Sequence, residues 1–133
     1  MTRLPFPSNE NSHSLPRLAA EGSDAAPWKR AAPTEPPPMM FQVRFLNGQV
    51  NSYAYADLRE TRLRDAGYLQ LGILGMEKYC VTIEGRHLTE LATLIGMGKI
   101  KAFEELGPRS FDRPESAPSI DSITVEMLTG PAL

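Results

Sequence analysis

The stretch from Phe41 to Tyr55, FQVRFLNGQVNSYAY, constrains the fold more than any other, because it has the pattern of a β-hairpin. Apolar and polar residues alternate from Phe41 to Phe45, which is the period of a strand with one buried face. Asn47-Gly48 follows, and both residues tolerate the positive φ that a two-residue type I′ turn requires. The sequence therefore predicts that the folded domain begins with this hairpin.

A two-residue loop also predicts the register of the hairpin. It places Phe45 opposite Val50 and Arg44 opposite Asn51. The predicted apolar face consists of Phe41, Val43, Phe45, Val50 and Ala54. The predicted polar face consists of Gln42, Arg44, Asn51, Tyr53 and Tyr55. We expect the apolar face to pack inside the domain.

Three further segments after the hairpin have the alternation of strands. They are Leu58–Arg64, Tyr68–Leu74 and Lys78–Ile83, and turn residues such as Asp65-Ala66-Gly67 separate them. Successive strands joined by short turns favour an antiparallel pairing. We therefore predict an antiparallel β-meander of about five strands.

The period then changes from two residues to that of a helix. Leu88, Leu91, Ala92 and Ile95 form one apolar stripe, which predicts a short amphipathic α-helix packed on the sheet. The next segment, Lys99–Leu106, fits a strand and a second helix equally well. The predicted class is α+β, with the meander packed against one helix.

The ends of the chain differ from this central domain, residues 39–106. Residues 1–38 hold eight of the 12 prolines without strand or helix periodicity, so we expect a disordered tail. The tail contains Trp28, which is either solvated, an anchor or packed back on the domain. An RxxPxxP spacing begins at Arg30 and fits either a polyproline ligand or a stiff spacer.

The C-terminal part of the chain is predicted to add one more strand. Residues 107–119 contain three prolines and are expected to form a loop. Residues 120–128 alternate again and form an edge strand, which pairs either within the chain or with another molecule.

Composition excludes several classes of protein. Net charge is −2 over 133 residues, and residues 39–106 balance eight basic against eight acidic side chains, so the domain lacks the basic excess of a dedicated nucleic-acid binder. One cysteine allows no internal disulfide, and we see neither a signal peptide nor a membrane span. These observations favour a cytoplasmic protein without membrane contact.

Catalytic chemistry is weakly supported. Cys80 and His87 are the one thiol and the one imidazole of the domain, but the cysteine is predicted in mid-strand and the histidine beyond a turn. Neither residue has partners at the spacing of a metal site, and the glycines form no nucleotide-binding loop. We therefore predict a non-enzymatic protein without a cofactor or a metal.

The strongest candidate for a binding surface is a set of arginines and tyrosines on the strands. Several of them are predicted to share the sheet face turned away from the helix: Arg44, Tyr53, Tyr55, Arg59, Arg62, Arg64 and Tyr68. Such a face suits a protein partner or self-association, and the exposed edge near Ile123 to Met127 offers a second surface. The alternative is single-stranded nucleic acid, whose bases stack on aromatics. An ordinary solvated face has the same composition.

Overall fold

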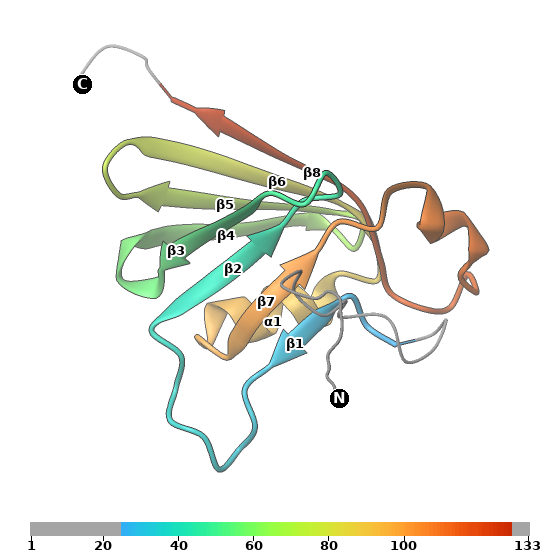
Figure 1. Cartoon of the computed structure of the whole chain (residues 1–133), viewed down its shortest axis with the longest axis horizontal. Coiled ribbons are helices and arrows are strands. Elements are labelled where there is room, and N and C mark those ends of the chain that lie inside the picture. The colour runs from blue at the N-terminus through green and yellow to red at the C-terminus, as the bar shows by residue number, and fades with distance from the viewer. Residues whose placement is uncertain (1–24, 129–133) are drawn as a thin grey trace, which may run out of the picture.

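The structure, a computed structural model, describes residues 25–128. Within that range the chain forms two four-stranded sheets, one α-helix and two short 3-10 helices (Figure 1). The strands are β1 (Trp28–Arg30), β2 (Met40–Arg44), β3 (Val50–Ala54), β4 (Leu58–Asp65), β5 (Tyr68–Leu74), β6 (Lys78–Arg86), β7 (Ile100–Glu104) and β8 (Ser119–Met127). The helices are α1 (Thr89–Gly96), η1 (Tyr55–Asp57) and η2 (Gly107–Asp112). The predicted α+β class is confirmed, but a single meander of five strands is wrong.

The first sheet has the strand order β1-β7-β2-β3. β2 and β3 form the predicted antiparallel hairpin, and β1 pairs antiparallel with β7. β2 and β7 run parallel, with Val43 opposite Phe103. A parallel pair needs a crossover, and here the crossover contains three strands of the second sheet together with α1.

The register of the hairpin differs by one residue from the predicted one. Arg44 lies opposite Val50, and Phe41 lies opposite Tyr53. Because side chains alternate across a strand, this shift moves Tyr53 to the face that carries Phe41. The predicted grouping of Tyr53 with Arg44 on one polar face is therefore wrong.

The turn of the hairpin explains the shift. Phe45 accepts a hydrogen bond from the Gly48 N–H at 3.0 Å and donates its own N–H to the Gln49 carbonyl at 2.9 Å. Gly48 has a φ of +94°, whereas the φ of Asn47 is not positive. A type I′ turn needs positive φ at both positions, so the loop is a three-residue turn with a glycine bulge.

The second sheet has the order β4-β5-β6-β8, and all its pairs are antiparallel. β4, β5 and β6 form the part of the predicted meander that the structure confirms. β8 lies on the other side of β6, with Ile83 opposite Ile123 and Tyr79 opposite Met127. The predicted C-terminal strand thus pairs within the chain.

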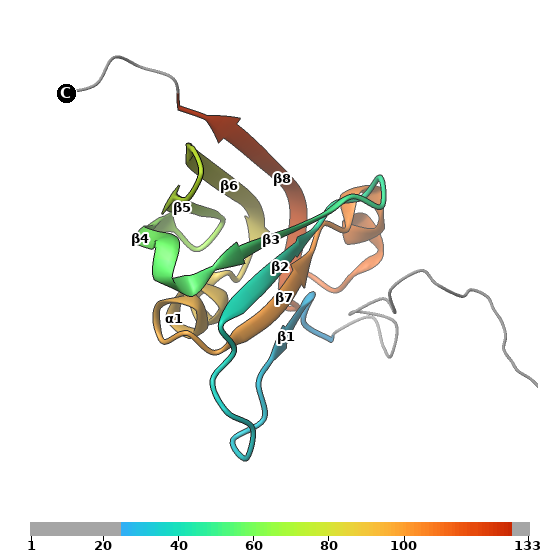
Figure 2. The ribbon, with the colours of Figure 1, turned by 60° about the vertical axis from the view of Figure 1, so that its left-hand side comes forward.

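The two sheets enclose a common core, and α1 covers one side of it by contacting β4 and β7 (Figure 2). The predicted helical stripe is buried, since Leu88, Leu91 and Ile95 are inaccessible to solvent. The helix also contributes Leu94, and the sheets supply the other core residues: Trp28, Phe41, Val43, Leu69, Leu71, Ile73, Val81, Ile83, Ile100, Phe103, Ile120 and Ile123. The domain is therefore stabilised by packing between elements that are far apart in the sequence.

Glu105 joins the two sheets at one end. One carboxylate oxygen accepts a hydrogen bond from the N–H of Leu46 in the hairpin turn at 3.0 Å. The other oxygen accepts from the N–H of Ile123 in β8 at 3.4 Å. The side chain thus connects the hairpin turn of the first sheet to the edge of the second.

The N-terminal boundary predicted at residue 39 is too late. Trp28 is buried in the core and opens β1, which pairs with β7 through Trp28 opposite Phe103. Of the three alternatives for Trp28, the structure shows the one in which its side chain packs on the domain. The earlier part of the predicted tail, residues 1–24, lies outside the described residues.

Two further segments, whose structure the sequence does not define, are ordered into regular elements. The segment Lys99–Leu106, which fits a strand and a helix equally well by sequence, contains the strand β7. The predicted loop of residues 107–119 contains η2 and then leads into β8. The region from 25 to 128 is consequently one continuous fold rather than a short domain with appendages.

Candidate functional site: the outer face of the first sheet

The seven residues predicted to form one surface are divided between the two sheets. Arg44 lies on β2 of the first sheet. Arg59, Arg62, Arg64 and Tyr68 lie on β4 and β5 of the second sheet. Tyr53 and Tyr55 belong to β3 and η1, and their rings turn toward the core. The structure therefore does not assemble the predicted surface as one unit.

The ring of Tyr53 packs between the sheets. It lies 5.9 Å from the ring of Phe41 in β2 and 5.8 Å from the ring of Tyr79 in β6, measured between centroids. Its hydroxyl oxygen accepts a hydrogen bond from the Asn51 side chain at 3.0 Å. Tyr53 is thus an aromatic contact between the two layers.

Tyr55 has a similar structural role at the start of β7. Its ring centroid lies 5.0 Å from that of Phe41. Its hydroxyl donates to the carbonyl of Ile100 at 2.7 Å and accepts from the Ile100 N–H at 2.9 Å. Burial raises the pKa of Tyr55 to about 12, partly offset by the hydrogen bond to the Ile100 carbonyl.

The arginines of β4 lie on an exposed edge strand. Arg62 forms a 2.5 Å ion pair with Glu60, and both side chains are largely solvated. The Arg64 guanidinium carbon lies 3.7 Å from the ring centroid of Tyr68, which is a cation–π contact. Among the seven predicted residues, Arg64 and Tyr68 are one pair that the structure does bring together.

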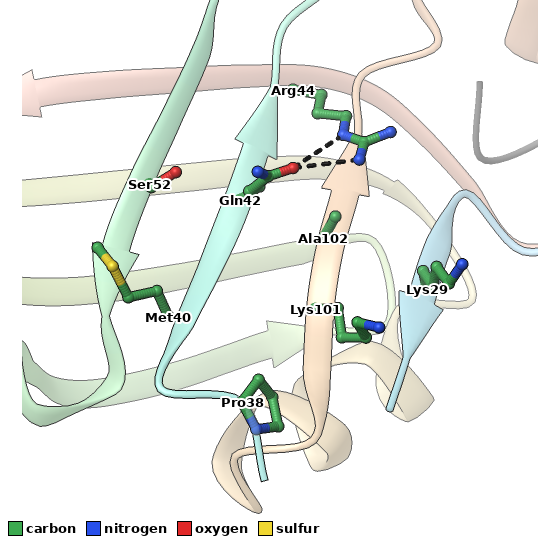
Figure 3. A pocket seen from close by; sticks show the side chains of 8 residues that line it. All are labelled: Lys29, Pro38, Met40, Gln42, Arg44, Ser52, Lys101 and Ala102. Atoms are coloured by element: carbon green, nitrogen blue, oxygen red, sulfur yellow. Dashed lines mark hydrogen bonds between the residues drawn. The ribbon is translucent and has the colours of Figure 1, made fainter. Parts of the chain in front are cut away.

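A shallow groove lies on the outer face of the first sheet, around Arg44. Its volume is about 470 Å³, and side chains from all four strands line it (Figure 3). The lining residues are Lys29, Pro38, Met40, Gln42, Arg44, Ser52, Lys101 and Ala102. The groove combines a small apolar floor with polar and cationic side chains.

The cations of the groove come from three different strands. Lys29 is on β1, Lys101 on β7 and Arg44 on β2. Arg44 donates from Nε and Nη2 to the Gln42 side-chain oxygen at 3.3 and 3.1 Å, which directs its guanidinium along the face (Figure 3). Positive charge is therefore spread over three of the four strands of this sheet.

Two carboxylates lie close to these cations. Glu35 forms a 3.0 Å ion pair with Lys101, and Glu104, opposite Arg44 in the register, lies 3.4 Å from Arg109. The pKa of Glu35 is lowered, first by the hydrogen bond from the Ala32 N–H and then by Lys101. Counted with Arg109, the three groove cations outnumber the two carboxylates and leave this face positive, although the chain as a whole is negative.

The residues considered for catalysis lie in separate environments. Cys80 contacts the side chains of Gln70 and Thr82 on the outer face of the second sheet. His87 follows β6, and its Nε2 lies 2.9 Å from the Glu115 carbonyl. An extended strand separates the two residues by roughly 20 Å, beyond the reach of a thiol–imidazole hydrogen bond. Within residues 25–128, no cluster of His, Cys, Asp or Glu has the arrangement of a metal site.

Comparison with known proteins adds no assignment. The chain matches no family model, no curated protein and no solved structure. Among the described residues, no helix has the length and apolarity needed to cross a bilayer.

Sequence reasoning missed two of the three groove cations. Lys29 lies in a strand of three residues, which is too short to show a period, and Lys101 lies in the segment with two equally good interpretations. The one available signal was the sequence Trp28-Lys29, a large apolar residue next to a charged one. Arg44 and Gln42 were correctly placed together on the outward face of the hairpin.

Proposed function

We propose that the domain is a non-enzymatic binding module that receives an extended, acidic protein segment across the outer face of the first sheet. The observation that carries the proposal is the convergence of Lys29, Arg44 and Lys101 on one open groove. Gln42 and Ser52 add side-chain groups able to bond a peptide backbone.

The open shape of the groove favours a segment of a macromolecule over a small molecule. Sites for small ligands enclose most of the ligand surface. Here Lys29, Met40 and Ser52 are exposed, and the groove is open to solvent across the strands. An extended segment can contact such a surface over its whole width.

The charge of the groove favours acidic side chains on the partner. Arg44 presents a planar guanidinium that suits a carboxylate, and the two lysines provide point charges on the neighbouring strands β7 and β1, on one side of it. Each exposed pair contributes about 0.2–1 kcal/mol, so several must act together for useful affinity. Met40, Pro38 and Ala102 offer apolar contact between the charges.

Single-stranded nucleic acid is less well supported as the ligand. Stacking of bases needs exposed aromatic rings, and the groove lining contains none. Tyr53 and Tyr55, the aromatics on which that alternative depends, pack toward Phe41. Binding of single-stranded nucleic acid is therefore the alternative outcome that the binding test can detect.

The test is a titration of the full chain into a fluorescently labelled Glu-rich peptide, followed by anisotropy. Lys29→Glu and Arg44→Glu should each raise the Kd about 3- to 10-fold, since each replaces an attraction by a repulsion. Lys78→Glu, the same charge change on the second sheet, should leave the Kd unchanged.

Two results would contradict the proposal. One is the absence of peptide binding even at low ionic strength, where exposed ion pairs are strongest. The other is an equal loss of affinity in Lys78→Glu, which would reduce the effect to net charge. Tighter binding of a single-stranded oligonucleotide, weakening steeply with salt, would favour the nucleic-acid alternative instead.

A further inference from the structure

The loop between β1 and β2, residues 31–39, borders the groove and brings an acidic side chain onto one of its cations. Pro38 of this loop lines the groove (Figure 3). Oε2 of Glu35 accepts a hydrogen bond from the Lys101 ammonium at 3.0 Å. One cation of the groove therefore already binds a carboxylate, and that carboxylate belongs to the chain itself.

Lys101 lies at a β-bulge. Ala102 is opposite Lys29 and Ile100 is opposite Arg30, so Lys101 is the extra residue of β7 against β1. A bulge of this kind turns a side chain away from the regular alternation of a strand. Ile100 and Ala102 are buried, whereas the Lys101 side chain is 38% exposed and lines the groove. The bulge thus allows Lys101 to reach the groove between two buried neighbours.

The turn at the start of the loop holds the Glu35 side chain in place. The Glu35 N–H donates to the Ala32 carbonyl at 3.0 Å, and the Ala32 N–H donates to Oε1 of Glu35 at 2.6 Å. Pro33, which lies inside this turn, has a φ fixed by its ring. The backbone therefore positions the carboxylate, in addition to Lys101.

The loop is also tied to the sheets at both ends. The Ala31 N–H donates to the Lys99 carbonyl at 2.8 Å, and the Met39 carbonyl accepts from the Tyr55 N–H at 2.9 Å. A tethered group has a high effective concentration at its binding partner. An acidic segment of another molecule must therefore compete with Glu35 for Lys101.

The charge of Glu35 opposes the cations of the groove. The pKa of Glu35 is lowered, first by the hydrogen bond from the Ala32 N–H, then by Lys101, and to a smaller extent by Lys29. The carboxylate is therefore ionised at neutral pH. It offsets the positive charge that an acidic ligand would bind.

We propose that Glu35 is an internal competitor for the groove: it occupies Lys101 in the free protein, and an acidic ligand displaces it. This inference rests on the proposed function, because it concerns the same groove and the same class of ligand. It adds a restraint on binding that the chain itself supplies.

Arg44 provides the attraction that drives the displacement. Its register partner in β7 is Glu104, three residues beyond Lys101, which separates the two positions by about 10 Å along the sheet. Glu35 is tied at the Lys101 position. A segment with several acidic side chains therefore gains an attraction at Arg44 in addition to the one that it takes over at Lys101.

Anisotropy titration of the full chain with the labelled Glu-rich peptide tests the competition. Glu35→Gln keeps an oxygen that can accept from the Ala32 N–H, but it removes the charge at Lys101. It should lower the Kd about 2- to 5-fold, the range that one exposed ion pair represents. Glu77→Gln removes the same charge from the exposed turn between β5 and β6, and it should leave the Kd unchanged.

A double-mutant cycle separates the ion pair from the general effect of charge. Lys101→Gln has no ammonium for Glu35 to occupy, so adding Glu35→Gln to it should change the Kd by less than about 1.5-fold. An equal gain with and without the lysine would overturn the proposal, since net charge alone would then explain the gain.

Two further outcomes distinguish this proposal from the proposed function. If the wild type binds the peptide and Glu35→Gln binds it with the same Kd, the competition is refuted and the groove remains the binding site. If neither protein binds the peptide at low ionic strength, the proposed function fails, and the competition fails with it.

Discussion

The hydroxyl of Tyr55 satisfies both backbone groups of Ile100, a residue with no solvent access. Tyr55→Phe removes the hydroxyl, so the N–H and the carbonyl of Ile100 lose this hydrogen-bond partner. We expect the free energy of unfolding to fall by about 1–3 kcal/mol, because a buried polar group that loses its partner keeps its desolvation cost. Urea denaturation followed by circular dichroism measures the change.

Tyr53→Phe is the matched control for that substitution. It removes the same atom, but the bond lost joins two partly solvated side chains, Asn51 and Tyr53. The expected cost is about 1 kcal/mol or less. Equal costs for the two variants would mean that the Ile100 bridge has no special role.

The same hydroxyl makes stability depend on alkaline pH. The pKa of Tyr55 is about 12 in the folded state, above its ordinary value of 10.0. Folding therefore favours the neutral phenol, and this stabilisation is complete below pH 10 and is lost as the pH rises toward 12. The stability difference between wild type and Tyr55→Phe should shrink across that interval. A difference that stays constant would contradict the assigned pKa.

Gly85 lies where β6 bulges against β8. A Cβ at this position would be 1.9 Å from the Ser119 carbonyl oxygen, so the two strands would have to separate. We expect Gly85→Ala to lower the free energy of unfolding by about 3 kcal/mol, measured by thermal or urea unfolding. Gly96→Ala is the control, since a Cβ there meets nothing within 4 Å, and it should be neutral or stabilising. Similar stabilities for the two variants would contradict the close approach of β6 and β8.

At the scale of elements, β1 shows how a three-residue strand becomes part of the core. Trp28 is 8% exposed and lies opposite Phe103. Trp28→Ala should reduce the free energy of unfolding by about 3–5 kcal/mol, the usual cost of removing a large buried aromatic side chain. Circular dichroism melts measure this loss. A near-neutral effect would restore the predicted boundary at residue 39.

Local patterns predicted the elements that are long and regular. β5 occupies the predicted residues Tyr68–Leu74, and the stripe through Leu91 faces the core as expected. In both cases the period extends over at least two repeats, and the buried face alone fixes the orientation.

The hairpin shows where local patterns are insufficient. Asn47-Gly48 suits a two-residue turn and also a three-residue turn with a glycine bulge, and both place Gly48 at positive φ. The one-residue difference moves the Tyr53 ring from the outer face to the core. The observed register also brings Tyr53 into contact with Tyr79 in the second sheet, and that contact is remote in sequence.

At the scale of the whole molecule, the division into two sheets decides which residues can form a site. The sequence places Arg44 and the arginines of β4 on successive strands, and a single meander would unite them. The chain instead leaves the first sheet after β3 and returns to it with β7, beside β2. The parallel β2–β7 pair has no local signature, so the meeting of Arg44 with Lys29 and Lys101 could not be predicted.

We infer that the ligand surface of this chain is the outer face of the first sheet. Amide NMR of the full chain, titrated with an unlabelled Glu-rich peptide, tests it most directly. We expect the shifted amides to cluster at Lys29, Gln42, Arg44 and Lys101, with β4 and β5 unchanged. Shifts centred on Arg62, Arg64 and Tyr68 instead would contradict the claim and place the ligand on the second sheet.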